Sequence, residues 1–146
     1  MERHVTQALQ NYGNGYTCAQ AVLCAYAEDM GLDMETAYRM IEGFGGGFGG
    51  MQEVCGALTA AFAVISYYNS DGRLEGGQTK LETYAKIREA AEYFKEEYGS
   101  VVCREVLCGA RPQPFKCGAK VKLAAEIVEK MMGREDDING IVQEAR

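Results

Sequence analysis

One glycine-rich stretch restricts how this chain can fold: GFGGGFGGMQEVCGALTAAF, from Gly43 to Phe62. Six of its first eight residues are glycine, and Cys55 follows them at the start of a long apolar run. Glycine adopts positive φ and lets another backbone or a bulky group approach closely. We therefore expect this stretch to turn the chain sharply, to present backbone N–H groups and to direct Cys55 toward a bulky centre.

Most of the remaining chain shows apolar residues at intervals of three and four, the pattern of amphipathic helices. The predicted helices cover about 5–12, 17–30, 34–41, 54–68, 81–98, 100–108 and 116–132. The segment 54–68 is apolar nearly all round, as expected of a central buried helix. We predict an all-α fold: a single-domain helical bundle of six or seven helices over residues 1–146, in which 134–146 frays or adds a short helix.

Composition narrows the classes of function. The 146 residues carry a net charge of -6 and no cluster of Lys and Arg, so we expect no nucleic-acid partner. No apolar run approaches the length that spans a bilayer, and we expect no membrane association. Because no apolar segment follows the charged N-terminus, a secretory signal is not expected, and we predict a reducing, cytoplasmic location.

Six cysteines are the anomaly of this composition. In a reducing compartment they indicate metal binding or redox chemistry rather than a disulfide framework, although a buried cysteine can also serve as a small apolar side chain. The N–H groups and partial positive charge at a helix start stabilise a thiolate. Four cysteines fall at predicted helix starts, which suggests one shared anionic centre: Cys18, Cys55, Cys103 and Cys117.

The other two cysteines lack that setting. Cys24 is in the middle of a predicted helix, and Cys108 is at a helix C-terminus. On an α-helix, Cys18 and Cys24 are rotated by about 120° from each other, so they would not face the same partner. We expect Cys24 and Cys108 to be additional thiols outside the centre.

Other chemistry has little support in the sequence. His4, the one histidine, lies in the first turn of a terminal helix, where we expect a surface position. Gly45, Gly47 and Gly50 satisfy G-x-G-x-x-G, but a helix rather than a strand precedes them, so a dinucleotide site is not expected. The alternative is that these glycines have a purely structural role and only let helices cross closely.

Four stretches, in order and across nearly the whole chain, resemble the C_GCAxxG_C_C family of redox-active proteins. They are TCAQAVL at 17–23, GFGGGFGGMQEVCGAL at 43–58, SVVCREVL at 100–107 and FKCGAKVKLAAEIVEKM at 115–131. Here the central block reads Cys55, Gly56, Ala57, so the order in the family name is not reproduced. Carried over position by position, the family cysteines are Cys18, Cys55, Cys103 and Cys117.

The resemblance implies redox activity without a defined substrate. A related domain in the split-Soret cytochromes is expected to hold an iron–sulfur centre. We therefore expect the four family cysteines to ligate an iron–sulfur cluster, of the [2Fe-2S] type, for one-electron transfer. Residues expected to support the ligands are Gln20, Glu53, Gly47, Gly49 and Gly50. For Glu53 alone, a solvated helix face is the alternative.

Two further hypotheses stay open. The first is a metal-free thiol–disulfide protein, whose paired cysteines the fold would have to bring together because no C-x-x-C is present. The second is structural zinc on the same four sulfurs, although the short C-x2-4-C spacing of most zinc sites is absent. The sequence does not identify a redox partner, and it leaves a symmetric homodimer open.

Overall fold

A computed structural model describes residues 2–106 and 117–133. In these residues the regular structure is helical, apart from one isolated antiparallel bridge between Val54 and Val102, and the all-α prediction is confirmed. The elements are α1 (Arg3–Gly13), α2 (Cys18–Ala27), α3 (Met34–Ile41), the 3-10 turn η1 (Glu42–Phe44), α4 (Gly56–Asn69), α5 (Lys80–Tyr98), α6 (Cys103–Val106) and α7 (Gly118–Met131). The predicted tail 134–146 lies outside the described residues.

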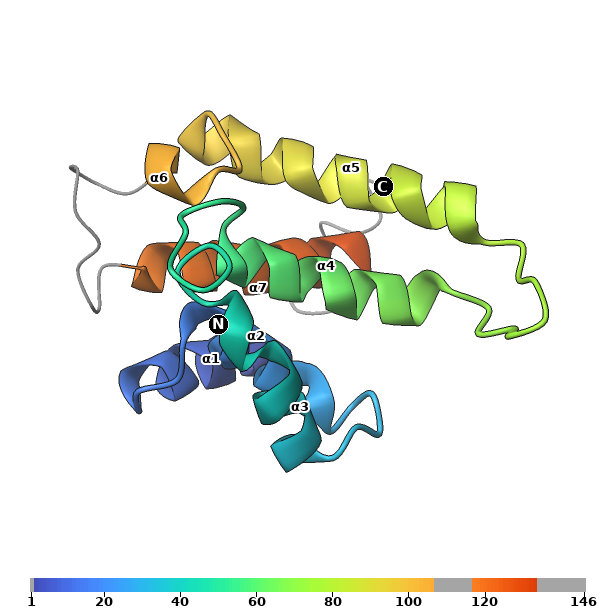
Figure 1. Ribbon diagram of the computed structural model, residues 1–146, viewed down its shortest axis with the longest axis horizontal. Coiled ribbons are helices and arrows are strands. Elements are labelled where there is room, and N and C mark those ends of the chain that lie inside the picture. The colour runs from blue at the N-terminus through green and yellow to red at the C-terminus, as the bar shows by residue number, and fades with distance from the viewer. Residues whose placement is uncertain (1, 107–116, 134–146) are drawn as a thin grey trace.

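The helices form three layers around α4 (Figure 1). α5 lies along one side, α4 and α7 run through the middle, and α1, α2 and α3 lie on the other side. Ala57, Leu58, Ala61 and Val64 on α4 are fully buried because α2, α5 and α7 all pack against this helix. The apolar run of 54–68 therefore forms the central buried helix that its composition predicts.

No helix in the described part of the chain is both long enough and apolar enough to cross a bilayer.

The three helices of the layer α1–α2–α3 all start with side-chain caps, and Glu2 caps α1 by accepting from the His4 and Val5 N–H groups. The Thr17 hydroxyl accepts from the Gln20 N–H (3.0 Å), and Gln20 Oε1 accepts from the Thr17 N–H (2.9 Å), which forms a capping box at the start of α2. Asp33 caps α3 by accepting from the Thr36 N–H (3.0 Å), as the sequence predicts. These bonds satisfy N–H groups that a helix start otherwise leaves without partners.

Removal of the α2 cap should measurably destabilise the fold. We expect Thr17→Ala to lower the free energy of unfolding by about 1 kcal/mol, the usual loss for such a cap. Thr36→Ala on the exposed face of α3 is the control: it removes an exposed hydroxyl that donates to Asp33 (3.1 Å) but leaves the Asp33 cap on the Thr36 N–H, and it should stay within about 0.5 kcal/mol of the wild type. Urea denaturation followed by circular dichroism measures both values. Equal stability of the two variants would contradict a capping role for Thr17.

Two predictions differ from the structure. The predicted helix 100–108 begins only at Cys103, because the preceding residues pair with the backbone around Val54 instead of coiling. His4, expected at the surface, is 3% exposed. Its ring nitrogens contact Glu2 and Asp29 at 2.8 and 2.6 Å, and these carboxylates allow a polar ring to be buried.

Candidate functional site

All four cysteines that the sequence groups together lie at helix N-termini, as predicted. Cys18 and Cys103 are the first residues of α2 and α6, whereas Cys55 and Cys117 are the N-cap residues of α4 and α7. Cys117 is half-buried and the other three are buried. The starts of α4 and α7 and the whole of α6 gather at the same end of the molecule, shown at the left of Figure 1.

Two backbone segments far apart in the sequence hold Cys55 beside Cys103. The Cys55 N–H donates to the Val101 carbonyl (2.9 Å), and the Cys103 N–H donates to the Glu53 carbonyl. These bonds flank the antiparallel bridge described above. The pairing places the start of α6 against the end of the glycine loop, which leads directly into α4.

Cys55 is the most deeply embedded of the four thiols. Burial raises its pKa to about 12, although the backbone N–H groups of Leu58 and Ala57 act against this by donating to the sulfur. The negative charges of Cys18 and Cys103 raise the same pKa further, so both sulfurs lie within electrostatic range of Cys55. The thiol is therefore neutral near pH 7 unless a cation takes the place of its proton.

Cys103 connects the remaining members of the group. Burial raises its pKa first, and the charges of Cys117 and Cys18 raise it further. The cations Lys120 and Arg104 act in the opposite direction. The sulfurs of the four helix-start cysteines therefore share one electrostatic environment that also contains two positive charges. We call these residues, Cys18, Cys55, Cys103 and Cys117, the cysteine group.

Cys24 stands apart from the cysteine group. Burial alone raises its pKa to about 11, with no contribution from another cysteine. It lies within α2, as the sequence predicts. Cys108 lies outside the described residues. Within those residues, no cysteine is in a disulfide.

Glycines at two positions allow the loop to pack directly on these sulfurs. A Cβ on Gly47, whose φ is +70°, would lie 2.7 Å from the Cβ of Cys103. A Cβ on Gly56 would lie 3.0 Å from the Cys18 Sγ and would collide with the Phe44 carbonyl. These two positions therefore require glycine for close approach, as the sequence suggested for the stretch as a whole.

The other glycines named as supporting residues act within the loop. The Gly49 and Gly50 N–H groups donate to the carbonyls of Gly43 (2.7 Å) and Gly45 (3.2 Å). Both residues have positive φ, which lets the loop fold back on itself. Of the three glycines predicted to surround the ligands, the structure brings Gly47 against a cysteine and uses Gly49 and Gly50 to hold the shape of the loop.

Gln20 and Glu53 position backbone segments that carry cysteines. Gln20 is buried, where it closes the cap at the start of α2 and donates from Nε2 to the Tyr38 carbonyl (3.1 Å). Glu53 is half-exposed and forms an ion pair with Arg104 (3.2 Å), which links the glycine loop to α6. Glu53 is therefore not on a helix face, because it precedes α4.

Lys120 is a functional candidate that the sequence analysis missed. It lies in the first turn of α7, is 3% exposed, and its ammonium is 4.9 Å from the centre of the Tyr98 ring. A cation near a helix N-terminus opposes the partial positive charge there, so this lysine needs compensation from negative charge. That unfavourable placement is the signal in the sequence that could have identified it.

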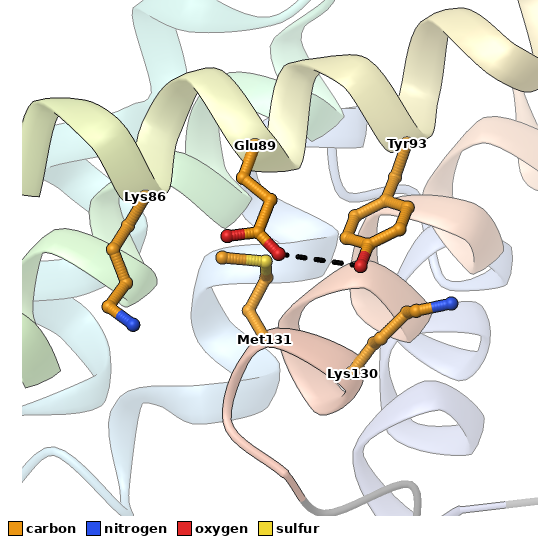
Figure 2. Close-up of a pocket in the computed structure, with 5 residues that line it drawn as sticks. All are labelled: Lys86, Glu89, Tyr93, Lys130 and Met131. Carbon is orange, nitrogen blue, oxygen red and sulfur yellow. Dashed lines mark hydrogen bonds between the residues drawn. The ribbon is translucent and has the colours of Figure 1, made fainter. Parts of the chain in front are cut away.

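One pocket of about 310 Å³ lies elsewhere, between α5 and α7. Figure 2 shows Lys86, Glu89 and Tyr93 on α5 facing Lys130 and Met131 at the end of α7. Because Met131 and Cys117 are at opposite ends of α7, the pocket is about 20 Å from the cysteine group by helix rise. The residues that line it include no thiol.

A family model described as "Putative redox-active protein (C_GCAxxG_C_C)" matches residues 16–131, a span that includes every member of the cysteine group. The chain belongs to the C_GCAxxG_C_C family. This match confirms the resemblance stated from the sequence, and the family description supports redox activity in general terms. Comparisons with curated proteins and with solved structures give no match.

Proposed function

We propose that this member of the C_GCAxxG_C_C family is an electron-transfer protein whose cysteine group holds an iron–sulfur cluster of the [2Fe-2S] type. The observation that carries the proposal is the convergence of four cysteines at helix starts, from four separate segments, in one electrostatic environment. Four thiolates are the common ligand set of such clusters. When bound, the cluster supplies transfer of single electrons.

The surroundings of the cysteine group fit an anionic cluster. The Leu58 and Ala57 N–H groups donate to the Cys55 sulfur, and hydrogen bonds of this kind stabilise metal-bound thiolate. Lys120 and Arg104 supply positive charge beside Cys103. Gly47 and Gly56 remove the side chains that would crowd Cys103 and Cys18. The residues present therefore offer ligands, hydrogen bonds and compensating charge.

The pKa directions favour a metal centre over thiol–disulfide exchange. Exchange requires a thiolate nucleophile, which forms readily when the thiol pKa is near or below the ambient pH. The pKa of Cys55 is about 12 and that of Cys103 is also raised, so neither thiol is an effective nucleophile near pH 7. A metal ion, by contrast, deprotonates a coordinating thiol outright.

The spacing of the sulfurs favours a cluster over a single zinc ion. Four sulfurs around one tetrahedral zinc, each about 2.3 Å from it, are roughly 3.8 Å apart. In the described residues, one group of three His, Cys, Asp or Glu ligand atoms lies within 4.8 Å of one another, and it contains no cysteine. Among the described residues no three cysteine sulfurs form so tight a group, which a single zinc ion would need and a two-iron cluster would not.

The test is anaerobic purification of the full chain after expression with sufficient iron. We expect brown protein with visible charge-transfer bands and equal amounts of iron and acid-labile sulfide, about two of each per chain for a [2Fe-2S] cluster. Colourless protein with one zinc per chain, bound by sulfur at about 2.3 Å in X-ray absorption, would establish the zinc hypothesis instead. Metal-free protein under the same conditions would overturn the proposal and favour dithiol chemistry.

We also propose that the protein acts in the reducing cytoplasm and that its partner is a redox protein.

Lys120 offers a test that depends on the redox state. Its positive charge stabilises the reduced, more negative form of the proposed centre, so we expect Lys120→Met to lower the reduction potential. A change of about 1 kcal/mol in charge interaction corresponds to roughly 40 mV for one electron. Lys122→Met, two residues later on another face of α7, is the control. A potential measured by voltammetry that falls equally in both variants would contradict the specific role of Lys120.

A further inference from the structure

A second group of metal-binding side chains lies away from the cysteine group. Glu2, His4 and Glu129 each offer a ligand atom, and these atoms all lie within 4.8 Å of one another. His4 Nδ1 is 2.8 Å from Glu2 Oε2 and 3.4 Å from Glu129 Oε2. Two of these residues come from the start of α1 and the third from near the end of α7.

Contacts around this group fix its orientation. His4 Nε2 is 2.6 Å from Asp29 Oδ2 and Nδ1 faces the two glutamates, so the tautomer with its proton on Nε2 donates to Asp29 and leaves the Nδ1 lone pair for a metal ion. The His4 ring stacks on the Tyr26 ring with 4.5 Å between centroids and 5° between planes. The Tyr26 hydroxyl donates to Glu129 Oε2 at 2.6 Å. A histidine that donates its second N–H to a carboxylate is the usual arrangement beside a bound metal.

The distances and the charge balance also suit a cation. Ligand atoms about 2.1 Å from one ion, at tetrahedral or octahedral angles, are roughly 3.0–3.4 Å apart. The side chains of His4 and Glu129 are each 3% exposed and that of Glu2 is 13% exposed, so two carboxylates are drawn out of water beside one imidazole. Asp29, the third carboxylate at this ring, is paired with Arg3 at 3.5 Å, so a protonated His4 would offset one of the two glutamate charges, whereas a divalent cation would offset both.

We propose that Glu2, His4 and Glu129 bind a zinc-like divalent transition-metal ion. One imidazole nitrogen and two carboxylate oxygens are ligands that zinc accepts, and three protein ligands leave a coordination position open to water or to a small ligand. The site is distinct from the cysteine group, because Glu129 and Cys117 are separated along α7 by about 18 Å of helix rise. Metal binding there joins the start of α1 to the end of α7.

The test counts zinc bound by the full chain in three variants and the wild type after equilibrium dialysis against Zn²⁺. Glu2→Gln removes a charge but keeps an oxygen for the N-cap bonds to the His4 and Val5 N–H groups. Glu129→Gln keeps an oxygen for the Tyr26 hydroxyl. The control is Glu126→Gln, one turn earlier on α7 at an exposed position. Zinc held by the cysteine group is common to all four proteins and cancels in the comparison.

We expect wild type and Glu126→Gln to bind one more zinc per chain than Glu2→Gln and Glu129→Gln, or to bind it at least about tenfold more tightly. The X-ray absorption of this extra zinc should show nitrogen and oxygen ligands at about 2.0 Å rather than sulfur at about 2.3 Å. Circular dichroism checks that each variant is folded. The same zinc content and affinity in Glu2→Gln and Glu126→Gln would overturn the proposal and leave a protonated His4 bonded to Glu2, since 2.8 Å also suits that hydrogen bond.

Discussion

Cys55→Ala should reduce the iron bound per chain by at least about tenfold and remove the visible charge-transfer bands, whereas Cys24→Ala should leave both unchanged. The two cysteines are similarly buried, at 4% and 2% exposed, so the substitutions remove equal volumes from comparable surroundings. They differ in their neighbours: the pKa of Cys55 responds to two other cysteines, and that of Cys24 responds to burial alone. Loss of one ligand costs at least as much as loss of the groups that support it, which is about 10- to 100-fold.

Iron and sulfide analysis of anaerobically purified protein measures this difference, and circular dichroism establishes that both variants are helical. Cys18→Ala, Cys103→Ala and Cys117→Ala should behave like Cys55→Ala, because each removes one member of the cysteine group. Iron content that survives in Cys55→Ala, or that falls equally in Cys24→Ala, would contradict the assignment of ligands. The second outcome would mean that iron binding reports general packing of the bundle.

Local signals were sufficient to predict that the members of the cysteine group lie at helix N-termini. Thr17 and Asp33 cap helices through side-chain oxygens that act within three residues, and Gly99 ends α5 with φ of +79°, so a short window of sequence contains the cause of each boundary. Because helix starts could be located, Cys18 and Cys55 could be assigned to N-termini without knowledge of the packing. Their meeting in space required the fold itself.

Features that depend on distant residues could not be predicted. α6 starts later than its local pattern indicates because the Val101 carbonyl accepts a hydrogen bond from the Cys55 N–H. Cys55 precedes α4 and Val101 follows α5, so the two residues are far apart in the sequence. His4 is buried because Asp29, from the turn after α2, and Glu129, from α7, contact its ring nitrogens. Nothing near His4 in the sequence specifies those partners, so a terminal histidine was assigned to the surface.

The glycine loop provides the second large effect, and a matched pair of substitutions isolates it. Gly47 and Gly50 have similar φ values of +70° and +78°, so alanine costs about 1–2 kcal/mol at either position from backbone strain. A Cβ on Gly50 meets nothing within 4 Å, whereas one on Gly47 would lie 2.7 Å from both the Cys103 Cβ and the Glu53 nitrogen. Gly47→Ala therefore adds an overpacking cost of about 1–3 kcal/mol.

The Glu53 nitrogen cannot easily move aside, because it donates to the Gly47 carbonyl at 2.9 Å. We therefore expect Gly47→Ala to lose about 2–5 kcal/mol of unfolding free energy and most of its iron, and Gly50→Ala to lose about 1–2 kcal/mol and keep its iron. Denaturant unfolding and iron analysis measure the two effects separately. Equal iron content in the two variants would mean that the loop supports the bundle without positioning Cys103, because the added methyl group at Gly47 points at that cysteine.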